Sequence, residues 1–145
     1  MTLTMELGSR SYDIVVQRGV LNEAASLLNL ARKCLIVTGE NVLEEYAARI
    51  ASQCKTPVIA RVPTGEGSKS FAQLERLCRI MLEQNFHRTD CVIAVGGGKV
   101  GDLAVEIAYA LPYYEKKGDG YRLVRRGAVL LSIFQSPIIT LGKTL

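Results

Sequence analysis

The sequence predicts an α/β fold with an open, mostly parallel sheet, and three observations lead to that prediction. Short apolar runs of strand type alternate with segments whose apolar residues recur at helical spacing. The most apolar run, 91–95, alternates too little for a sheet with one face in water. A glycine-rich segment joins that run to a helix-like one. This order of elements implies right-handed crossovers between parallel strands and helices that flank the sheet.

The composition is that of an ordinary soluble globular domain. Of the 145 residues, 48% are apolar and 22% are charged. No stretch approaches the roughly 18 consecutive apolar residues of a membrane span, and no secretory leader opens the chain. The net charge of +4 comes partly from a short basic cluster near the carboxyl end, which a solvated surface explains. We therefore expect a cytoplasmic protein that binds neither nucleic acid nor a membrane.

The elements before residue 63 follow from the spacing of apolar residues. Runs of β-formers predict strands, whereas apolar residues at i, i+3, i+4 and i+7 predict helices. Pro57 falls at the first position of one strand, where its missing N–H does least harm. The expected elements are an antiparallel hairpin over 3–16, a helix over 21–28, a strand over 33–38, a helix over 43–54 and a strand over 57–62.

The helix that begins after Ser70 is the clearest in the chain. Ser70 and Gln73 form a capping-box pattern, and an apolar face follows them. That face contains Phe71, Leu74, Leu77, Cys78, Met81 and Leu82. The strand 91–95 comes next, and its continuous apolar character predicts a central position in the sheet.

The last third of the chain carries weaker patterns. A helix is expected to begin near Asp102 and to end before Pro112, because the residue before a proline disfavours the α region. Residues 113–120 predict a polar loop, and the runs 127–134 and 138–141 are of strand type. Residues 113–145 are therefore expected to be a divergent tail that can add strands to the domain formed by residues 1–112.

A glycine pattern between the strand 91–95 and the next helix points to a ligand. Gly96, Gly98 and Gly101 fit G-x-G-x-x-G, where backbone N–H groups and the helix dipole can hold a pyrophosphate. A tight strand-to-helix turn is the alternative, since no acidic residue follows at the end of an adjoining strand about 20 positions on. Asp102 is either a helix cap or a ligand for ribose hydroxyls. This placement predicts a Rossmann-like nucleotide-binding domain over residues 1–112.

A second loop, Val-Pro-Thr-Gly-Glu-Gly-Ser-Lys-Ser over residues 62–70, lies one helix earlier. Glu66 and Lys69 are three residues apart around a glycine turn, so one can accept hydrogen bonds from a nucleotide while the other offers a cation. A solvated ion pair beside the helix start is the alternative. Together the two loops predict two edges of one nucleotide pocket.

Cysteine and histidine residues give no sign of a metal or redox centre. The single histidine, His87, follows the apolar end of a helix, and a role at that helix terminus is favoured over one as a base or metal ligand. One histidine cannot form the usual catalytic metal site, and no G-x-S-x-G motif indicates a hydrolase. No C-x-x-C pair occurs, so we expect buried, reduced, structural thiols at Cys34, Cys54, Cys78 and Cys91.

The paired motifs P-x-G-E-x-x-K and G-G-G-x-x-G-D, with the helix and strand between them, closely resemble the N-terminal domain of 3-dehydroquinate synthase. The resemblance covers about residues 1–104. It implies that the chain binds NAD between the two loops. One side would hold the nucleotide through Gly65, Glu66 and Lys69, and the other would hold the pyrophosphate and the nicotinamide-side ribose through Gly97, Gly98, Gly101 and Asp102.

The resemblance also implies a reaction and an assembly. Enzymes of this family are carbon–oxygen lyases of the shikimate pathway, which use NAD transiently while 3-deoxy-D-arabino-heptulosonate 7-phosphate loses phosphate and cyclises to 3-dehydroquinate. The family forms a homodimer, and a helical C-terminal domain binds zinc or cobalt through a glutamate and two histidines that this chain lacks. We therefore expect the NAD-binding portion of such an enzyme, inactive by itself.

Three departures from the family pattern keep two alternatives open. The family usually has an aspartate after the second strand for the adenine-side ribose, whereas this chain has Thr38-Gly39-Glu40 there, so that contact is lost or passes to Glu40. Lys99 replaces a small apolar residue and is closer to glycerol and glycerol-1-phosphate dehydrogenases, so a polyol dehydrogenase is the first alternative. The motifs that the family carries further along are not recognisable after residue 104. A non-catalytic nucleotide-binding remnant is therefore the second alternative.

Overall fold

The computed structural model describes residues 1–65, 70–87, 89–110, 113–117, 120–124, 128–133 and 138–144, with side chains described only within 1–107. The strands are β1 (Thr2–Met5), β2 (Tyr12–Val16), β3 (Lys33–Gly39), β4 (Thr56–Val62), β5 (Cys91–Val95), β6 (Tyr113–Lys117), β7 (Gly120–Val124), β8 (Ala128–Ile133) and β9 (Ile138–Thr144). The helices are α1 (Ala24–Leu27), α2 (Glu44–Ala51), α3 (Phe71–Glu83) and α4 (Gly98–Ala110), with 3-10 turns η1 (Gly8–Arg10) and η2 (Val20–Glu23).

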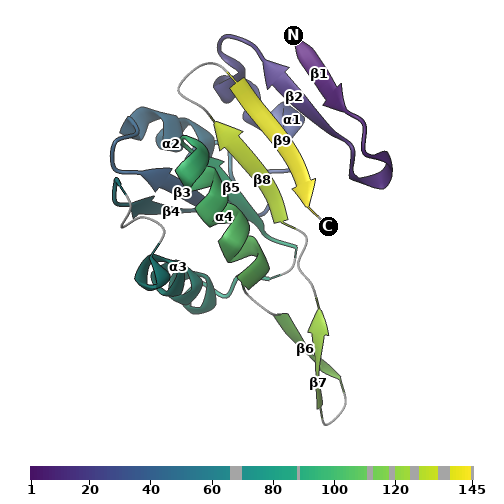
Figure 1. The fold of residues 1–145 in the computed structure, drawn as a ribbon, viewed down its shortest axis with the longest axis vertical. Helices are drawn as coiled ribbons and strands as arrows, with labels where there is room; N and C mark the ends of the chain where they lie inside the picture. The colour runs from purple at the N-terminus through teal and green to yellow at the C-terminus, as the bar shows by residue number, and fades with distance from the viewer. Residues whose placement is uncertain are drawn as a thin grey trace.

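A seven-stranded sheet in the order β1-β2-β9-β8-β5-β3-β4 forms the centre of the molecule (Figure 1). Neighbouring strands are parallel from β4 through β3 and β5 to β8, and antiparallel from β8 through β9 and β2 to β1. Only β1 and β9 therefore run against the direction of the other five. The predicted α/β fold, with its N-terminal hairpin and central strand 91–95, is confirmed.

The two faces of the sheet bury different layers of helices. Cys34 and Ile36 of β3 belong to the same core cluster as Ile50 of α2, and the intervening Leu35 and Val37 join the layer of α3 and α4. This alternation is the two-residue period of a strand. Because helices cover both faces, β3 and β5 are apolar along their length rather than at every second residue.

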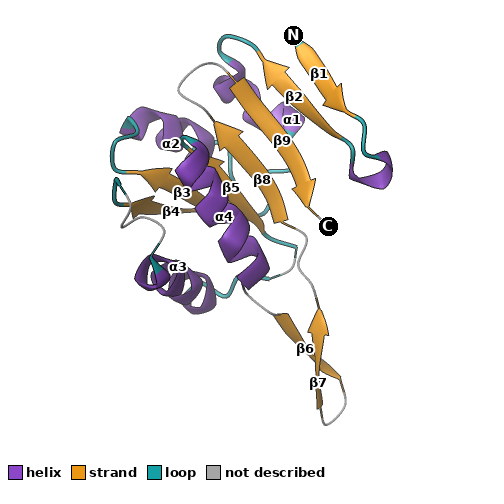
Figure 2. Cartoon of the chain, in the orientation of Figure 1, coloured by secondary structure: helices purple, strands orange, loops and turns teal. Residues whose placement is uncertain are grey.

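The chain after α4 adds strands to the same sheet. Ala94 and Val95 of β5 pair with Ser132 and Ile133 of β8, and β9 then lies between β8 and β2. β6 and β7 form a separate antiparallel hairpin that projects away from the sheet (Figure 2). The polar loop expected over 113–120 is therefore wrong for the part of it that the structure describes. Tyrosines in this polar segment have a high strand propensity, which outweighs the polar character on which the loop prediction rested.

Three expectations about residues 1–82 need correction. The helix expected over 21–28 is a 3-10 turn followed by a four-residue α-helix, because so short a segment lacks the length that makes helices stable. Phe71 and Leu82 are 90% and 67% exposed, since α3 packs through Leu77 and Met81 instead. Pro57 is the second residue of β4, not the first, and is tolerated because β4 is an edge strand.

The start of α3 follows the sequence prediction in part. Ser70 Oγ accepts a hydrogen bond from the backbone N–H of Gln73 at 3.4 Å, which is half of a capping box. The side-chain oxygen of Gln73 accepts from Arg76 at 3.2 Å instead of turning back to Ser70. Among the described residues, no helix is both long enough and apolar enough to span a membrane.

Two isoleucines of the sheet test how much the central strands contribute to the free energy of unfolding. Ile93 of β5 is fully buried, whereas Ile59 of the edge strand β4 is 47% exposed. We expect Ile93→Ala to lower the free energy of unfolding by about 2–5 kcal/mol, because it leaves a cavity in the core. Ile59→Ala, the matched control, should cost less than about 1 kcal/mol. Urea unfolding followed by circular dichroism measures both, and equal losses would contradict this role of the central strands.

Candidate functional site

The carboxyl ends of β3, β4 and β5 enclose a cavity of about 240 Å³. Its described lining residues are Gly39, Asn41, Pro63, Thr64, Gly65, Gly97, Gly98, Lys99 and Val100. The chain goes from β3 to β4 on one side and then crosses to β5 on the other side of β3. Open α/β sheets bind their ligands at such a switch point, outside the carboxyl ends of the strands. The structure thus brings both motif loops to one cavity.

The glycine loop after β5 leads into α4 earlier than the sequence predicted. α4 begins at Gly98, and the N–H groups of Val100 and Gly101 both donate to the Gly97 carbonyl at 3.1 Å. Asp102 therefore lies one turn into the helix, exposed, and its expected place in the first turn is wrong. The reason is that glycine, although a poor helix former, is accepted at a helix terminus. The first N–H groups of α4 have no partner within the helix, so the positive end of its dipole lies at the cavity.

The glycines of this loop have three different roles. A Cβ at Gly96 would lie 2.9 Å from Cγ2 of Val100, so the packing of α4 excludes any side chain there. A Cβ at Gly97 or Gly98 would have no atom within 4 Å, and both residues line the cavity. Gly101 is buried and does not line it, which fits a role in close helix packing. The backbone is therefore open to a ligand at Gly97 and Gly98.

The loop after β4 supplies the opposite wall. Gly65 lines the cavity with a φ of 89°, in the left-handed region that favours glycine. Glu66 and Lys69, the two charged residues singled out in the sequence, lie outside the described residues. Lys99 is the only charged residue among those described residues that line the cavity. Its ammonium group and the α4 dipole both favour an anion there.

The third wall is the loop between β3 and α2, in which the sequence pattern had pointed only to Glu40. Asn41 lines the cavity, whereas Glu40 is exposed and is not among the lining residues. Asn41 is the second residue beyond β3, so the rule that ligands bind beyond the carboxyl ends of strands would have identified it. Whether Glu40 takes over a ribose contact remains a prediction.

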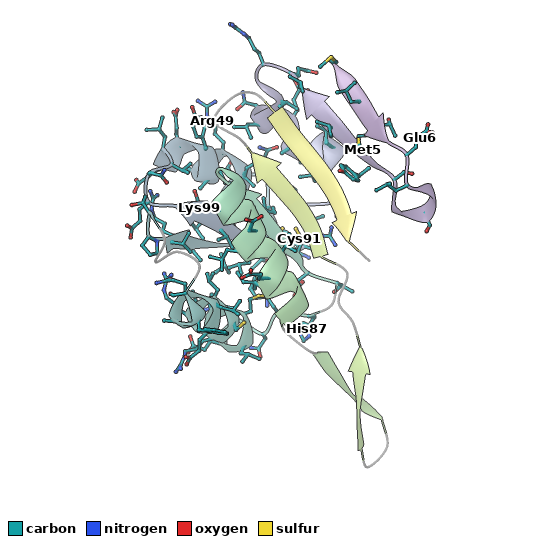
Figure 3. All side chains as sticks on the ribbon, in the orientation of Figure 1. Met5, Glu6, Arg49, His87, Cys91 and Lys99 are labelled. Atoms are coloured by element: carbon teal, nitrogen blue, oxygen red, sulfur yellow. The ribbon has the colours of Figure 1, made fainter. Side chains whose placement is uncertain are left out.

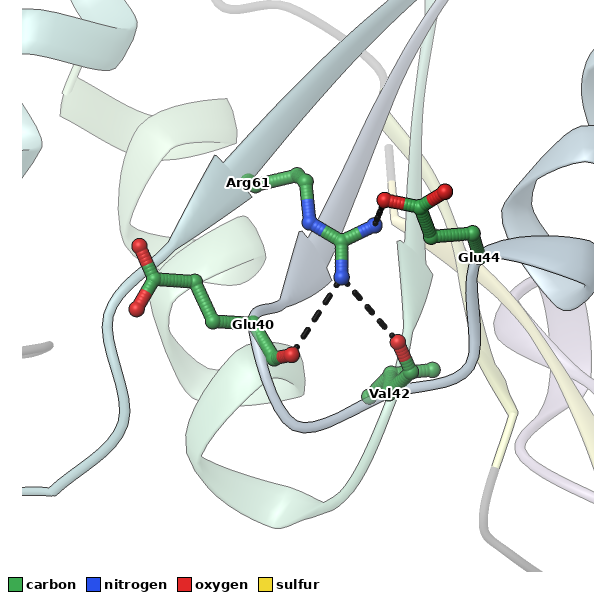
Figure 4. Close-up of polar contacts among 4 residues, drawn as sticks. All are labelled: Glu40, Val42, Glu44 and Arg61. Atoms are coloured by element: carbon green, nitrogen blue, oxygen red, sulfur yellow. Dashed lines mark hydrogen bonds and ion pairs between the residues drawn. The ribbon is translucent and has the colours of Figure 1, made fainter.

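Arg61 of β4 holds this loop in place (Figure 4). Its Nη2 donates to the carbonyl of Glu40 at 3.3 Å and to that of Val42 at 3.1 Å, and Nη1 pairs with Glu44 at 3.4 Å. The N–H of Glu40 donates in turn to the carbonyl of Val62 at 2.9 Å. The carbonyls on both sides of Asn41 are thus fixed by one guanidinium group.

His87 lies away from the cavity. It follows α3 before the amino end of β5, whereas Lys99 follows the carboxyl end, and Figure 3 shows the two residues well apart. At the end of α3, Lys33 Nζ donates to the carbonyls of Gln84 and Asn85 at 2.5 and 3.1 Å, so a lysine interacts with this helix terminus. Within the described part of the chain, no three or more His, Cys, Asp or Glu residues are grouped so that they could hold a metal ion.

Comparison with known proteins identifies the family. Residues 11–133 match the family model described as iron-containing alcohol dehydrogenase. The chain belongs to this family. It is 40% identical over 168 aligned positions to 3-dehydroquinate synthase of Rhizobium etli, an alignment that covers 99% of this chain and 44% of that protein. It is 36% identical over 114 positions to 3-dehydroquinate synthase of Desulforamulus reducens, covering 74% and 32%. The resemblance found in the sequence is confirmed.

The alignments also revise the extent of that resemblance. The Rhizobium etli match includes nearly all of the chain, so it extends beyond residue 104 into the tail, in which no family motif could be recognised. Its 168 aligned positions exceed the 145 residues of this chain, so the relative carries residues that this chain lacks. The chain spans less than half the length of these curated relatives.

Solved structures share the fold. A crystal structure of 2-deoxy-scyllo-inosose synthase superposes with a TM-score of 0.74 at 18% identity, covering 92% of this chain and 36% of that one. A second structure of a protein with that name, complexed with carbaglucose-6-phosphate, NAD+ and Co2+, gives 0.67 at 19% identity and covers 77% and 32%. At these identities the likeness establishes the Rossmann-like fold.

Replacing Arg61 tests whether it orders the loop that carries Asn41. In Arg61→Met the carbonyls of Glu40 and Val42 lose their donor, and we expect faster amide hydrogen exchange in residues 40–42 with a loss of about 1–2 kcal/mol of unfolding free energy. Arg79→Met is the matched control, because Arg79 makes an exposed ion pair with Glu75 on α3. That variant should stay within about 0.5 kcal/mol of the parent protein. Unchanged exchange in Arg61→Met would contradict this role.

Proposed function

We propose that the cavity at the carboxyl ends of β3, β4 and β5 binds NAD, and that the chain is the nucleotide-binding portion of a 3-dehydroquinate synthase. One observation carries the proposal: both motif loops and the loop of Asn41 converge on this cavity, beside the N-terminus of α4. The names of the curated relatives support it. Further support comes from the complex of 2-deoxy-scyllo-inosose synthase, which shares the fold and contains NAD+.

The residues of the cavity fit a dinucleotide. Open space at Gly97 and Gly98 lets a pyrophosphate approach the backbone, and the N–H groups of Gly98 and Lys99 are available as donors at the helix start. The Lys99 ammonium group adds positive charge, and the Asn41 amide offers hydrogen bonds to a ribose. When bound, NAD supplies the reversible oxidation of a substrate hydroxyl.

The remaining contacts are proposed from the family resemblance. Gly65 gives the left-handed turn that brings the loop after β4 to the cavity. We propose that Glu66 and Lys69 contact the nucleotide from that loop, that Asp102 contacts the nicotinamide-side ribose, and that Gly101 acts by allowing α4 to pack closely.

The reaction we propose for the whole enzyme is the phosphate-eliminating cyclisation of 3-deoxy-D-arabino-heptulosonate 7-phosphate, a cytoplasmic lyase step of the shikimate pathway. This chain spans 44% of its Rhizobium etli relative, and its described residues do not form a metal site. Its own part in the reaction is therefore to bind and orient the cofactor, and no metal-dependent step is assigned to its residues.

Titration calorimetry tests cofactor binding directly. We expect the chain to bind NAD and Gly98→Val to weaken that binding at least about tenfold, because a β-branched side chain would occupy the path of the pyrophosphate. Ala72→Val, an exposed helical position on α3, is the matched control and should bind like the parent protein. Circular dichroism of both variants confirms folding. No heat with millimolar NAD would refute the proposal and leave only a structural role for the chain.

A second function is favoured by two observations. Lys99 lines the cavity, and the matching family model is described as an alcohol dehydrogenase, so a polyol dehydrogenase is the competing candidate.

Two assays on the purified chain with NAD and zinc test whether it completes either reaction by itself. We expect no phosphate release from the heptulosonate phosphate and no NADH from glycerol, because cofactor binding without the rest of the enzyme does not complete either reaction. Turnover of the heptulosonate phosphate would contradict the expected inactivity of this portion, and formation of NADH with glycerol would favour the dehydrogenase.

A further inference from the structure

The carboxyl end of β3 lacks a side chain at the place where dinucleotide-binding sheets usually carry a carboxylate. In such sheets the pyrophosphate lies at the start of the helix after the glycine loop, and an acidic residue beyond a nearby strand binds the 2′-hydroxyl of the adenine-side ribose. Here the glycine loop follows β5, and β3 is the neighbouring strand whose end lines the cavity. The last residue of β3 is Gly39, so this position offers no carboxylate to a ribose.

The amide of Asn41 occupies the space that a side chain at residue 39 would take. A Cβ at Gly39 would lie 2.6 Å from Oδ1 of Asn41 and 3.6 Å from Cγ2 of Val100. The amide is uncharged and can both donate and accept hydrogen bonds, so it can pair with a ribose hydroxyl or with a phosphate oxygen. A carboxylate in the same place would accept from the hydroxyl but repel the phosphate.

The charges around the end of β3 favour an additional phosphate. Among the described residues that line the cavity, Lys99 is positively charged and none is acidic, and the exposed Glu40 is not one of them. Nη2 of Arg61 lies 3.3 and 3.1 Å from the carbonyl oxygens on the two sides of Asn41, so a second cation lies close to this loop (Figure 4). The side chain of its ion-pair partner, Glu44, is 86% exposed, so solvent screens that carboxylate.

We propose that the cavity binds NADP as well as NAD, because its described residues present no carboxylate to the 2′-oxygen of the adenine-side ribose. This inference rests on the proposed function, since it concerns which dinucleotides the same cavity takes. A phosphate at that oxygen carries a charge of about −1.5 to −2 at pH 7. The Asn41 amide can donate to this phosphate, and the two nearby cations attract it.

A carboxylate introduced at residue 39 tests this explanation. Gly39 belongs to β3 and its φ is not in the left-handed region, so its backbone is compatible with a side chain. The new Cβ would come too close only to the tip of Asn41, which is exposed and can turn away. Gly39→Asp therefore adds a negative charge beside the ribose. Gly39→Asn, the matched control, adds a side chain of nearly the same size without the charge.

The experiment is titration calorimetry of the full chain with NAD and with NADP, in about 50 mM salt so that screening is weak. For the parent protein we expect the two dissociation constants to agree within about tenfold. In Gly39→Asp, NADP should weaken at least about tenfold relative to NAD, because two negative charges meet. In Gly39→Asn the ratio of the two constants should stay within about threefold of the parent ratio, since no charge is added.

The parent protein decides the question even where a variant folds poorly. If NAD binds and NADP binds more than about tenfold more weakly, this inference is overturned and the proposed function stands. Absence of binding for both cofactors would refute the proposed function, and this inference with it. A ratio that shifts equally in the two variants would contradict the explanation, because size rather than charge would then decide the preference.

Salt dependence gives a further readout. The affinity for NADP should fall more steeply with added salt than the affinity for NAD, because the extra phosphate is attracted by Lys99 and Arg61 through charge. Equal slopes for the two cofactors would contradict that attraction.

Discussion

The parallel pairing of β3 with β5 is the constraint on which the rest of the molecule depends. The register runs from Cys34 opposite Cys91 to Thr38 opposite Val95, and every residue of β5 is buried. Side chains of the two strands alternate between two separate core layers. A shift of one residue would exchange the layers, sending the residues that pack against α2 toward α3 and α4. Burial on both faces therefore fixes the register and the positions of the helices together.

Both ends of this strand pair bring separate segments of the chain together, for the same geometric reason. Parallel strands place their carboxyl ends at one edge of the sheet, so the loops after β3 and β5 must meet there, and the loop after β4 joins them. Val100 links this edge to the core, because it is buried among the residues of α3 and α4, lines the cavity and excludes a side chain at Gly96. The amino ends bring Cys34 and Cys91 together by the same register. One strand pairing thus places the cavity that we propose binds NAD at one edge and two buried cysteines at the other.

The buried parallel strands could be predicted almost to the residue, whereas helix faces and termini could not. β3, β4 and β5 match the expected runs within one residue, because strands covered on both faces are continuous apolar segments bounded by polar ones. The start of α4 was predicted too late in the chain, because a glycine such as Gly98 indicates a loop in a sequence, whereas Gly98 is helical in the structure. Phe71 and Leu82 satisfied the helical period yet lie outside the packed face, since periodicity does not indicate how wide that face is.

The sequence by itself determined the class of fold, the order of the strands and helices from β3 to α4, the two glycine loops and the resemblance to 3-dehydroquinate synthase, because each of these is recorded in short-range patterns of residues. The cavity's third wall was decided only by the tertiary structure, since the loop of Asn41 is held by Arg61 from another strand. The cysteines illustrate the same limit: no spacing motif joins Cys34, Cys54 and Cys91, and only the strand register and the return of the chain after α2 place them in one core layer. Contacts between distant segments depend on topology and register, which local periodicity does not record.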